Sequence, residues 1–183
     1  MGDVKGMDIP IKLATPLLDS DIRALTVGDS VLLSGEIYTA RDAAHKRLCQ
    51  MLGESLPPPF PFEGQVVFYA GPCPARPGEI IGSIGPTTSS RMDTFTPTLM
   101  ERGLRYMIGK GKRNNTVRES IRRLGGVYFV AVGGAAALMS RCVTAVRTVA
   151  FPELGTEAIR ALTVVDFPVV VGIDSRGHDI YVR

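Results

Sequence analysis

The sequence lacks the features of an exported, disulfide-bonded or membrane-spanning protein. Its first ten residues contain no apolar segment typical of a signal peptide, and its longest apolar run, residues 127–139, is shorter than the roughly 20 residues of a membrane-spanning helix. The chain has three cysteines, an odd number at wide spacing without a Cys-x-x-Cys pair, which supports neither a disulfide framework nor a zinc knuckle. We therefore expect a cytoplasmic protein that does not associate with membranes.

Complete catalytic and metal-binding motifs are also missing. The chain has two histidines and no histidine-rich metal site, no Ser-His-Asp order and no paired-carboxylate constellation. Cys49, Cys73 and Cys142 could in principle hold an iron–sulfur cluster with one open iron. Because they are not clustered in the sequence, we interpret them instead as small buried residues that bind no metal.

A strong charge imbalance is absent as well. The net charge of +3 is too small to indicate a nucleic-acid-binding surface. Basic residues gather in one segment, which contains Lys110, Lys112, Arg113, Arg118, Arg122 and Arg123. This segment is consistent with an anion site or, in its second half, with the solvated face of a helix.

The residues that are present predict one α/β domain. The chain has 183 residues, 45% of them hydrophobic and 21% charged, which is enough for a single globular domain over residues 1–183. Apolar and β-branched segments predict strands at 9–18, 31–40, 65–71, 79–85, 104–111 and 127–134, and a hairpin at 169–182. Helical spacing and end signals predict helices at 41–53, from about 92 or 97 to before 103, at 116–126 and at 135–142, with a proline-rich connector at 55–64. Two neighbouring strand pairs lack an intervening helix, so we predict a mixed sheet in a layered domain instead of a regular doubly wound sheet.

Three polar and basic segments each follow a predicted strand: residues 39–47, 85–93 and 108–114. Loops at strand ends in α/β domains commonly bind ligands, because the sheet holds them rigidly while backbone N–H groups face outward. Arg41 lies at the start of a predicted helix, where a cation opposes the helix dipole, and this placement suggests an anionic ligand. His45 lies one turn later on the same face, where it could share that ligand, support it through a hydrogen bond, or simply be packed.

The other two segments offer hydroxyls and further cations. Lys110 lies between two glycines, which let the backbone approach a ligand closely, but the phosphate-loop pattern is incomplete because no Ser or Thr follows it. Arg91 offers a planar fork suited to a carboxylate or phosphate, beside several hydroxyl residues. A threonine hydroxyl is a weak base, so Thr87 or Thr88 would need a nearby cation or second group to transfer a proton. A helix N-cap with spare hydroxyls is the alternative for this segment.

The segments TARDAAHKR (39–47), GPCPARPGEIIGSIGPTTSSRMD (71–93) and MIGKG (107–111), in this order, resemble the β subunit or C-terminal domain of class I iron–sulfur fumarate hydratases and L(+)-tartrate dehydratases. The resemblance continues through residues 125–139 and 151–177 and covers nearly the full chain. It implies a swivelling β/β/α-type domain that closes over a separate α subunit. It also implies that the α subunit carries an oxygen-sensitive 4Fe–4S cluster on three cysteines, and that two αβ pairs assemble.

The resemblance implies reversible hydration of fumarate to malate, or dehydration of tartrate. The open iron would act as a Lewis acid on the substrate hydroxyl and one carboxylate, while a base removes the proton α to the other carboxylate. By their places in the motifs, three cations would bind the carboxylates: Arg41, Arg91 and Lys110. Thr87 would transfer the proton. Three residues would have supporting roles: His45, Thr88 and Asp93.

Several alternatives stay open at this point. Lys110 and Lys112 both lie in GKGK, so the choice of Lys110 rests on its place directly after MIG. The residues that bind carboxylates do not distinguish fumarate from tartrate. A non-catalytic anion- or dicarboxylate-binding regulatory domain, or a self-sufficient phosphate-handling protein using residues 110–123, would also fit.

Overall fold

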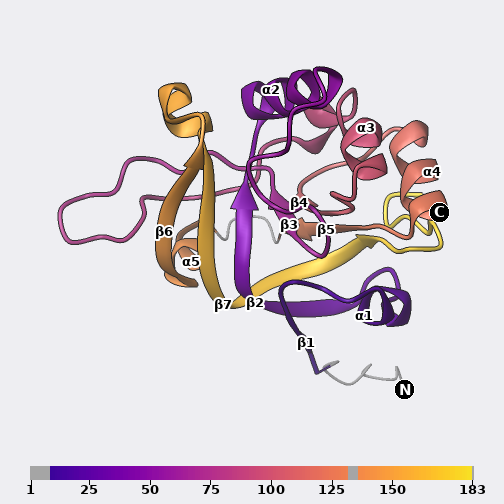
Figure 1. Ribbon diagram of the computed structural model, residues 1–183. Coiled ribbons are helices and arrows are strands. Elements are labelled where there is room, and N and C mark those ends of the chain that lie inside the picture. The colour runs from indigo at the N-terminus through magenta and orange to yellow at the C-terminus, as the bar shows by residue number, and fades with distance from the viewer. Residues whose placement is uncertain (1–8, 132–135, 183) are drawn as a thin grey trace.

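Seven strands form one mixed sheet in the computed structural model, which describes residues 9–131 and 136–182. The strand order is β1-β2-β3-β4-β5-β7-β6 (Figure 1). The strands are β1 (Ile11–Ala14), β2 (Ser30–Thr39), β3 (Val66–Phe68), β4 (Tyr106–Gly109), β5 (Val127–Ala131), β6 (Val143–Ala150) and β7 (Ile159–Ile173).

The long strand β7 partly closes this sheet into a barrel. Strands β1 to β5 pair in succession as parallel neighbours. Strand β7 runs antiparallel to β5 through residues 169–173, and it also runs antiparallel to β2 through residues 160–170. The edge strand β6 pairs only with the first part of β7 among the described strands. Because β2 contacts both β3 and β7, the strands from β2 to β5 and β7 form a ring.

Helices connect the strands and cover the sheet. They are α1 (Asp19–Ala24), α2 (Asp42–Gly53), α3 (Thr96–Glu101), α4 (Asn115–Leu124) and α5 (Ala136–Arg141), with short 3-10 helices η1 (Ser89–Met92) and η2 (Pro152–Glu157). Figure 1 shows α2, α3 and α4 together on one side of the domain, away from α1. Helix α4 begins after Asn114, whose side-chain oxygen accepts a hydrogen bond from the Val117 N–H as an N-cap.

Side chains alternate along the strands between two apolar cores. In β4, Tyr106 and Ile108 belong to a core that includes Ile22 of α1, whereas Met107 packs with the residues under α2, α3 and α4. Both faces of the central strands are therefore buried, which explains why these strands read as nearly continuous apolar runs.

The predicted mixed α/β layered domain is confirmed, but one predicted strand is wrong. Residues 79–85 are irregular, although Ile81 and Ile84 are buried. Gly82 lies so close to the backbone carbonyls of Cys73 and Pro74 that a Cβ would overlap them. Residues 71–85 thus form an extended loop that reaches away from the domain (Figure 1) instead of a strand pair.

The predicted hairpin at 169–182 is correct only in part. Residues 174–178 do turn, but within the described residues they are followed by a bridge between Ile173 and Asp179 and not by a second strand. Strand β7 begins ten residues earlier than predicted. Helix α1, strand β6 and the first part of β7 were not predicted. The parts of the predicted strand 127–134 and helix 135–142 that fall on residues 132–135 lie outside the described residues. Within residues 9–131 and 136–182, no helix has the length and hydrophobicity needed to cross a membrane.

Candidate functional site

The three segments singled out in the sequence meet at one edge of the sheet. Strands β2, β3 and β4 are parallel neighbours, so their carboxyl ends lie side by side. Arg41 comes two residues after β2, and Lys110 comes directly after β4. The loop after β3 leaves this edge and returns to it at Pro86, which forms a bridge with Ala70.

Backbone hydrogen bonds hold residues 86–89 between the ends of β3 and β4. The N–H of Thr87 donates to the Tyr69 carbonyl over 2.6 Å, and the N–H of Ser89 donates to the Lys110 carbonyl over 3.0 Å. Thr88 forms a bridge with Lys110. The Thr87 side chain is half-buried and that of Thr88 is exposed. Thr87 and Lys110 are therefore brought to the same strand edge by main-chain contacts.

Ser89 is the buried residue that fixes this loop. Its Oγ accepts a hydrogen bond from the Lys110 N–H over 2.9 Å and lies 2.8 Å from the Tyr128 hydroxyl, which also donates to the Gly111 carbonyl. A Cβ at Gly109 would overlap the Ser89 hydroxyl, so glycine is required for this close approach. Burial raises the pKa of Tyr128, which keeps its hydroxyl protonated.

Both candidate lysines are exposed, but their backbones differ. The N–H and C=O of Lys110 both bond to Ser89. Among the described residues, the backbone of Lys112 makes no hydrogen bond to residues 86–89. Lys112 follows Gly111, whose backbone is in the left-handed region. The backbone of Lys110 thus lies against the loop that carries Thr87, although its role in substrate binding stays a prediction.

Arg91 and Arg41 flank the carboxylate of Asp42. The Nε of Arg91 donates to Oδ1 of Asp42 over 2.9 Å, and the Nε of Arg41 lies 3.9 Å from Oδ2. That oxygen and the Arg41 Nε are buried without a hydrogen-bond partner among the described residues. Gly71 allows the Arg41 side chain to lie against the chain, because a Cβ there would come within 3.0 Å of the Arg41 Cδ. Helix α2 and η1 together thus hold two cations around one acidic residue.

The unfavourable placement of Arg41 at the start of α2 is offset by two carboxylates. Arg41 is the N-cap residue but makes no capping hydrogen bond through its side chain. Asp42 lies in the first turn, and Glu157 of η2 accepts a hydrogen bond from the Ala43 N–H over 3.2 Å. Carboxylates at a helix N-terminus are favourable, so the local structure tolerates the arginine.

His45 is buried and supports the backbone at Arg41. Its Nδ1 lies 2.9 Å from the Arg41 carbonyl, so this nitrogen carries the proton and donates it. The ring contacts Tyr69 edge-on. Burial lowers the pKa of His45 from 6.5 to about 4. At neutral pH the imidazole is uncharged, so of the options open for this residue the geometry matches the supporting hydrogen bond better than an ionic contact to a ligand.

Asp93 pairs with a buried arginine. Its Oδ1 accepts a hydrogen bond from the Arg113 Nε over 2.6 Å, and its Oδ2 accepts one from the Asn114 N–H over 2.8 Å. The guanidinium also donates to Thr96 and lies over the rings of Tyr69 and Tyr128. Both carboxylate oxygens of Asp93 thus accept hydrogen bonds from residues just before α4, and they hold η1 against the start of that helix.

The basic segment 110–123 does not form one site. Lys110 and Lys112 are exposed at the strand edge described above, whereas Arg113 is buried. Arg122 and Arg123 lie at the far end of α4, on a cavity of about 450 Å³ whose lining also contains Arg23, Arg105 and Arg176.

Two arginines of that cavity bind backbone carbonyls of the protein. Arg105 donates to the Leu124 carbonyl at the end of α4, and Arg176 donates to the Leu25 carbonyl at the end of α1. Cations near the carboxyl ends of helices are favourable, which accounts for their convergence.

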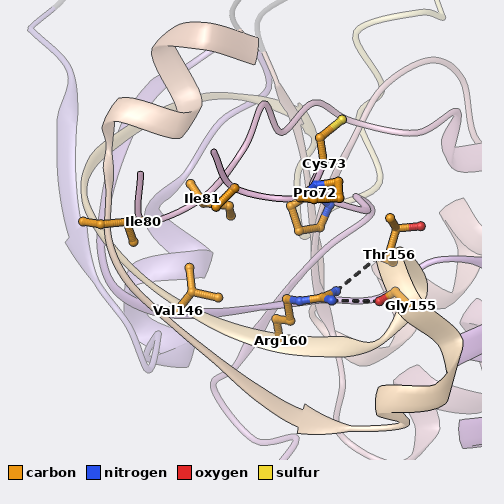
Figure 2. A pocket seen from close by; sticks show the side chains of 10 residues that line it. Pro72, Cys73, Ile80, Ile81, Val146, Gly155, Thr156 and Arg160 are labelled. Atoms are coloured by element: carbon orange, nitrogen blue, oxygen red, sulfur yellow. Dashed lines mark hydrogen bonds between the residues drawn. The ribbon is translucent and has the colours of Figure 1, made fainter. Parts of the chain in front are cut away.

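A second cavity, of about 380 Å³, lies between the extended loop and the β6–β7 region (Figure 2). Apolar side chains such as Ile81 and Val146 make up much of its lining. Arg160 also faces it, but its guanidinium donates to the carbonyls of Gly155 and Thr156 over 2.8 and 3.3 Å. This cavity is thus poorly suited to a dicarboxylate, because the guanidinium of Arg160 is already bound to backbone carbonyls.

The three cysteines lie on different parts of the chain. Cys49 is on α2, Cys73 is on the extended loop, and Cys142 follows α5. The expectation that they are buried is wrong, because Cys73 is exposed and the other two are half-buried. Within the described part of the chain, no three His, Cys, Asp or Glu side chains are grouped to hold a metal ion. These residues therefore do not fit a cysteine-bound cluster.

Four residues that organise the candidate site were not among the site residues predicted from the motifs: Asp42, Ser89, Arg113 and Tyr128. Asp42 and Ser89 lie inside the two motifs, so motif membership could have indicated them. Arg113 and Tyr128 contact the site only through the tertiary fold, and their sequence context gives no signal for this.

Comparison with known proteins gives the family. A family model described as Fumarase C-terminus matches residues 3–183. The chain is 37% identical over 171 residues to the putative L(+)-tartrate dehydratase subunit beta of Methanocaldococcus jannaschii, covering 90% of this chain and 88% of that protein. It is 36% identical over 157 residues to fumarate hydratase 2 of Leishmania major, covering 85% of this chain and 28% of that protein.

A third relative, the anaerobic class I fumarate hydratase of Escherichia coli, is 32% identical over 181 residues, covering 97% of this chain and 33% of that protein. The chain therefore spans about a third or less of the fumarate hydratases, but most of the tartrate dehydratase subunit.

Proposed function

Because the chain belongs to the Fumarase C-terminus family, whose named relatives are hydro-lyases, we propose that it is the β-type half of such an enzyme. It would hydrate fumarate to malate reversibly, or dehydrate tartrate. The remaining part of the enzyme would be supplied by a cluster-bearing α-type subunit.

The observation that carries this proposal is the exposed group of cations at one strand edge. Arg91 is 52% exposed and Lys110 is exposed, whereas Arg41 is 25% exposed. They lie in the three segments that meet at this edge, where Thr87 is half-buried. A dicarboxylate needs several cations, and an arginine fork can fix a planar carboxylate at two points. The same charges would stabilise the negative charge that builds up as the carbon α to a carboxylate loses its proton.

This strand edge is open to solvent in the chain by itself. Electrostatic stabilisation is far more effective in a site that excludes water. A second protein surface closing over this edge would exclude water. This requirement supports an α-type partner, as does the similarity to a protein named as a subunit.

Thr87 would act at the reacting carbon. Its main chain is fixed to Tyr69, which gives the hydroxyl a defined position. Within residues 9–131 and 136–182 its hydroxyl has no hydrogen-bonded base, so a group that activates it would come from substrate or partner. Lys110, at the adjacent strand end, would favour the deprotonated hydroxyl by its charge.

The iron–sulfur cluster is placed on the partner in this proposal. When bound there, it would supply a Lewis acid for the substrate hydroxyl and one carboxylate. The residues of this chain would bind, orient and deprotonate the substrate.

The test is calorimetric titration with fumarate, tartrate and inorganic phosphate, using the chain alone and the chain mixed with its α-type subunit under anaerobic conditions. We expect dicarboxylate binding to be strong only in the mixture, with one of the two dicarboxylates turned over. Tight phosphate binding by the chain alone would favour the phosphate-handling alternative. Dicarboxylate binding without turnover in the mixture would favour a regulatory domain.

A further inference from the structure

Asp42 lies between the two arginines expected to bind substrate. One carboxylate oxygen accepts the Arg91 Nε–H over 2.9 Å, and the other lies 3.9 Å from the Arg41 Nε. The side chain of Asp42 is 31% exposed, so this pair of contacts is partly shielded from water. The segments that carry Arg91 and Asp42 are far apart in the sequence, and this carboxylate forms an ionic contact between them.

The contact to Arg91 leaves most of that guanidinium available. Asp42 bonds to the Nε alone, and the two terminal nitrogens of Arg91 have no partner among the described residues. A carboxylate that occupied the substrate position would be expected to take two N–H groups side by side. The single contact instead orients the guanidinium and leaves its terminal edge for a ligand.

Asp42 also separates two like charges. Guanidinium groups that converge on one substrate repel each other, and a carboxylate between them reduces this repulsion. The carboxylate itself is held in place, because it lies in the first turn of α2, where the helix dipole favours an anion. A site residue carried by a helix is positioned more accurately than one carried by a loop.

We propose that Asp42 is a positioning residue, which holds Arg91 and Arg41 so that their remaining N–H groups face a substrate carboxylate. This inference rests on the proposed function for the identity of that substrate. The position of Arg91 can be measured independently of it.

The first measurement uses the chain alone. In a ¹⁵N–¹H spectrum, the Arg91 Nε–H signal is identified by its loss in Arg91→Lys, and its exchange with water is measured. We expect exchange to be faster by about 3-fold or more in Asp42→Ala, because the Nε–H then loses the carboxylate that shields it from water, and a partly exposed ion pair gives modest protection of this order. Asp21→Ala is the matched control, since Asp21 lies in the first turn of α1 without a contact to the site.

The second measurement uses the chain with its α-type subunit. We expect Asp42→Ala to raise KM for the dicarboxylate about 10- to 100-fold with a much smaller change in kcat, because the carboxylate contact is made before and during the reaction. Asp42→Asn keeps the size of the side chain and should show a smaller effect of the same kind. If Asp42→Ala does not fold, Asp42→Asn replaces it in this comparison.

The outcomes separate the two claims. A wild-type complex that turns over neither fumarate nor tartrate contradicts the proposed function before any variant is compared, and the exchange of the Arg91 Nε–H still decides whether Asp42 positions that residue. An Nε–H exchange rate or a KM that is the same in Asp42→Ala and Asp21→Ala would overturn the proposal for Asp42.

Discussion

Arg113 and Asp93 form a buried ion pair that joins two segments of the candidate site. The Nε–Oδ1 distance is 2.6 Å, and the side chains are 0% and 7% exposed. Asp93 directly follows η1, which carries Arg91, and Arg113 precedes α4, shortly after Lys110. The pair thus fixes the distance between the loop with Arg91 and the end of β4.

Breaking this pair should destabilise the fold strongly. Asp93→Ala leaves the Arg113 charge buried without its partner, which typically costs about 3–5 kcal/mol. The exposed pair of Glu101 and Arg123 provides the control, because Glu101→Ala should cost less than about 1 kcal/mol. Denaturant unfolding of both variants measures the difference, and equal losses would contradict a structural role for Asp93.

Substitution of Gly109 should disturb the site from inside. In Gly109→Ala the new Cβ would overlap the Ser89 hydroxyl and lie 2.9 Å from Cδ2 of Tyr69. Overpacking of this kind costs about 1–3 kcal/mol, and it would displace the residues next to Thr87. In Gly53→Ala the Cβ has no atom within 4 Å, so that variant should be at least as stable as the wild type. A Gly109→Ala protein with unchanged midpoint of denaturation would show that the loop is not held this closely.

His45 should make stability depend on pH in the acid range. The pKa of His45 is lowered to about 4 by burial, against 6.5 in the unfolded chain, so the unfolded state takes up a proton first as the pH falls. The contribution of His45 is therefore full above pH 6.5 and is lost as the pH falls towards 4, a change of about 3 kcal/mol.

The test compares unfolding of the wild type and His45→Asn between pH 7 and 4. The other titratable groups are common to both proteins, so the difference in slope reports His45. Parallel pH profiles would mean that His45 is not buried in its neutral form.

Arg91→Lys should abolish most turnover of the proposed complex with an α-type subunit while leaving the fold intact. An ammonium group cannot form the two-point contact to a carboxylate, and losing one such stabilising contact commonly lowers kcat on the order of 10²-fold or more. Arg122→Lys, at the far end of α4 and 61% exposed, should be without effect. Near-normal kcat/KM in Arg91→Lys would remove Arg91 from the site.

The central parallel strands could be predicted because their apolar residues are local in the sequence. Residues 79–85 were wrongly predicted as a strand because the segment is rich in isoleucine. Two of these isoleucines, Ile81 and Ile84, are buried. They are buried by packing of an irregular loop around Gly82, which depends on Cys73 and Pro74 of the opposite arm of the loop. The edge strand β6 exposes polar residues on more than one side, so it has no clear alternation that would indicate a strand.

The candidate site was predictable in part, because Arg41 and Lys110 follow the neighbouring strands β2 and β4. Arg91 was expected after a strand at 79–85 that does not form, and it reaches the same edge through the loop after β3. The order and spacing of Arg41, Arg91 and Lys110 could be read from motifs and from strand ends. The pairing of Arg91 with Asp42, and of Asp93 with Arg113, joins segments that are distant in sequence. Such pairings depend on how η1 packs against α2 and α4, which local patterns do not specify.

The most direct test of the proposed shared site is an activity titration under anaerobic conditions. The proposed cluster-bearing α-type subunit is kept at a fixed concentration, the chain is added, and the loss of fumarate or tartrate is followed. We predict no turnover by either protein alone, a rise that saturates at an equimolar ratio, and inhibition when excess Arg91→Lys chain competes for the α-type subunit. Turnover by the chain alone, or the absence of turnover at any ratio, would contradict the account.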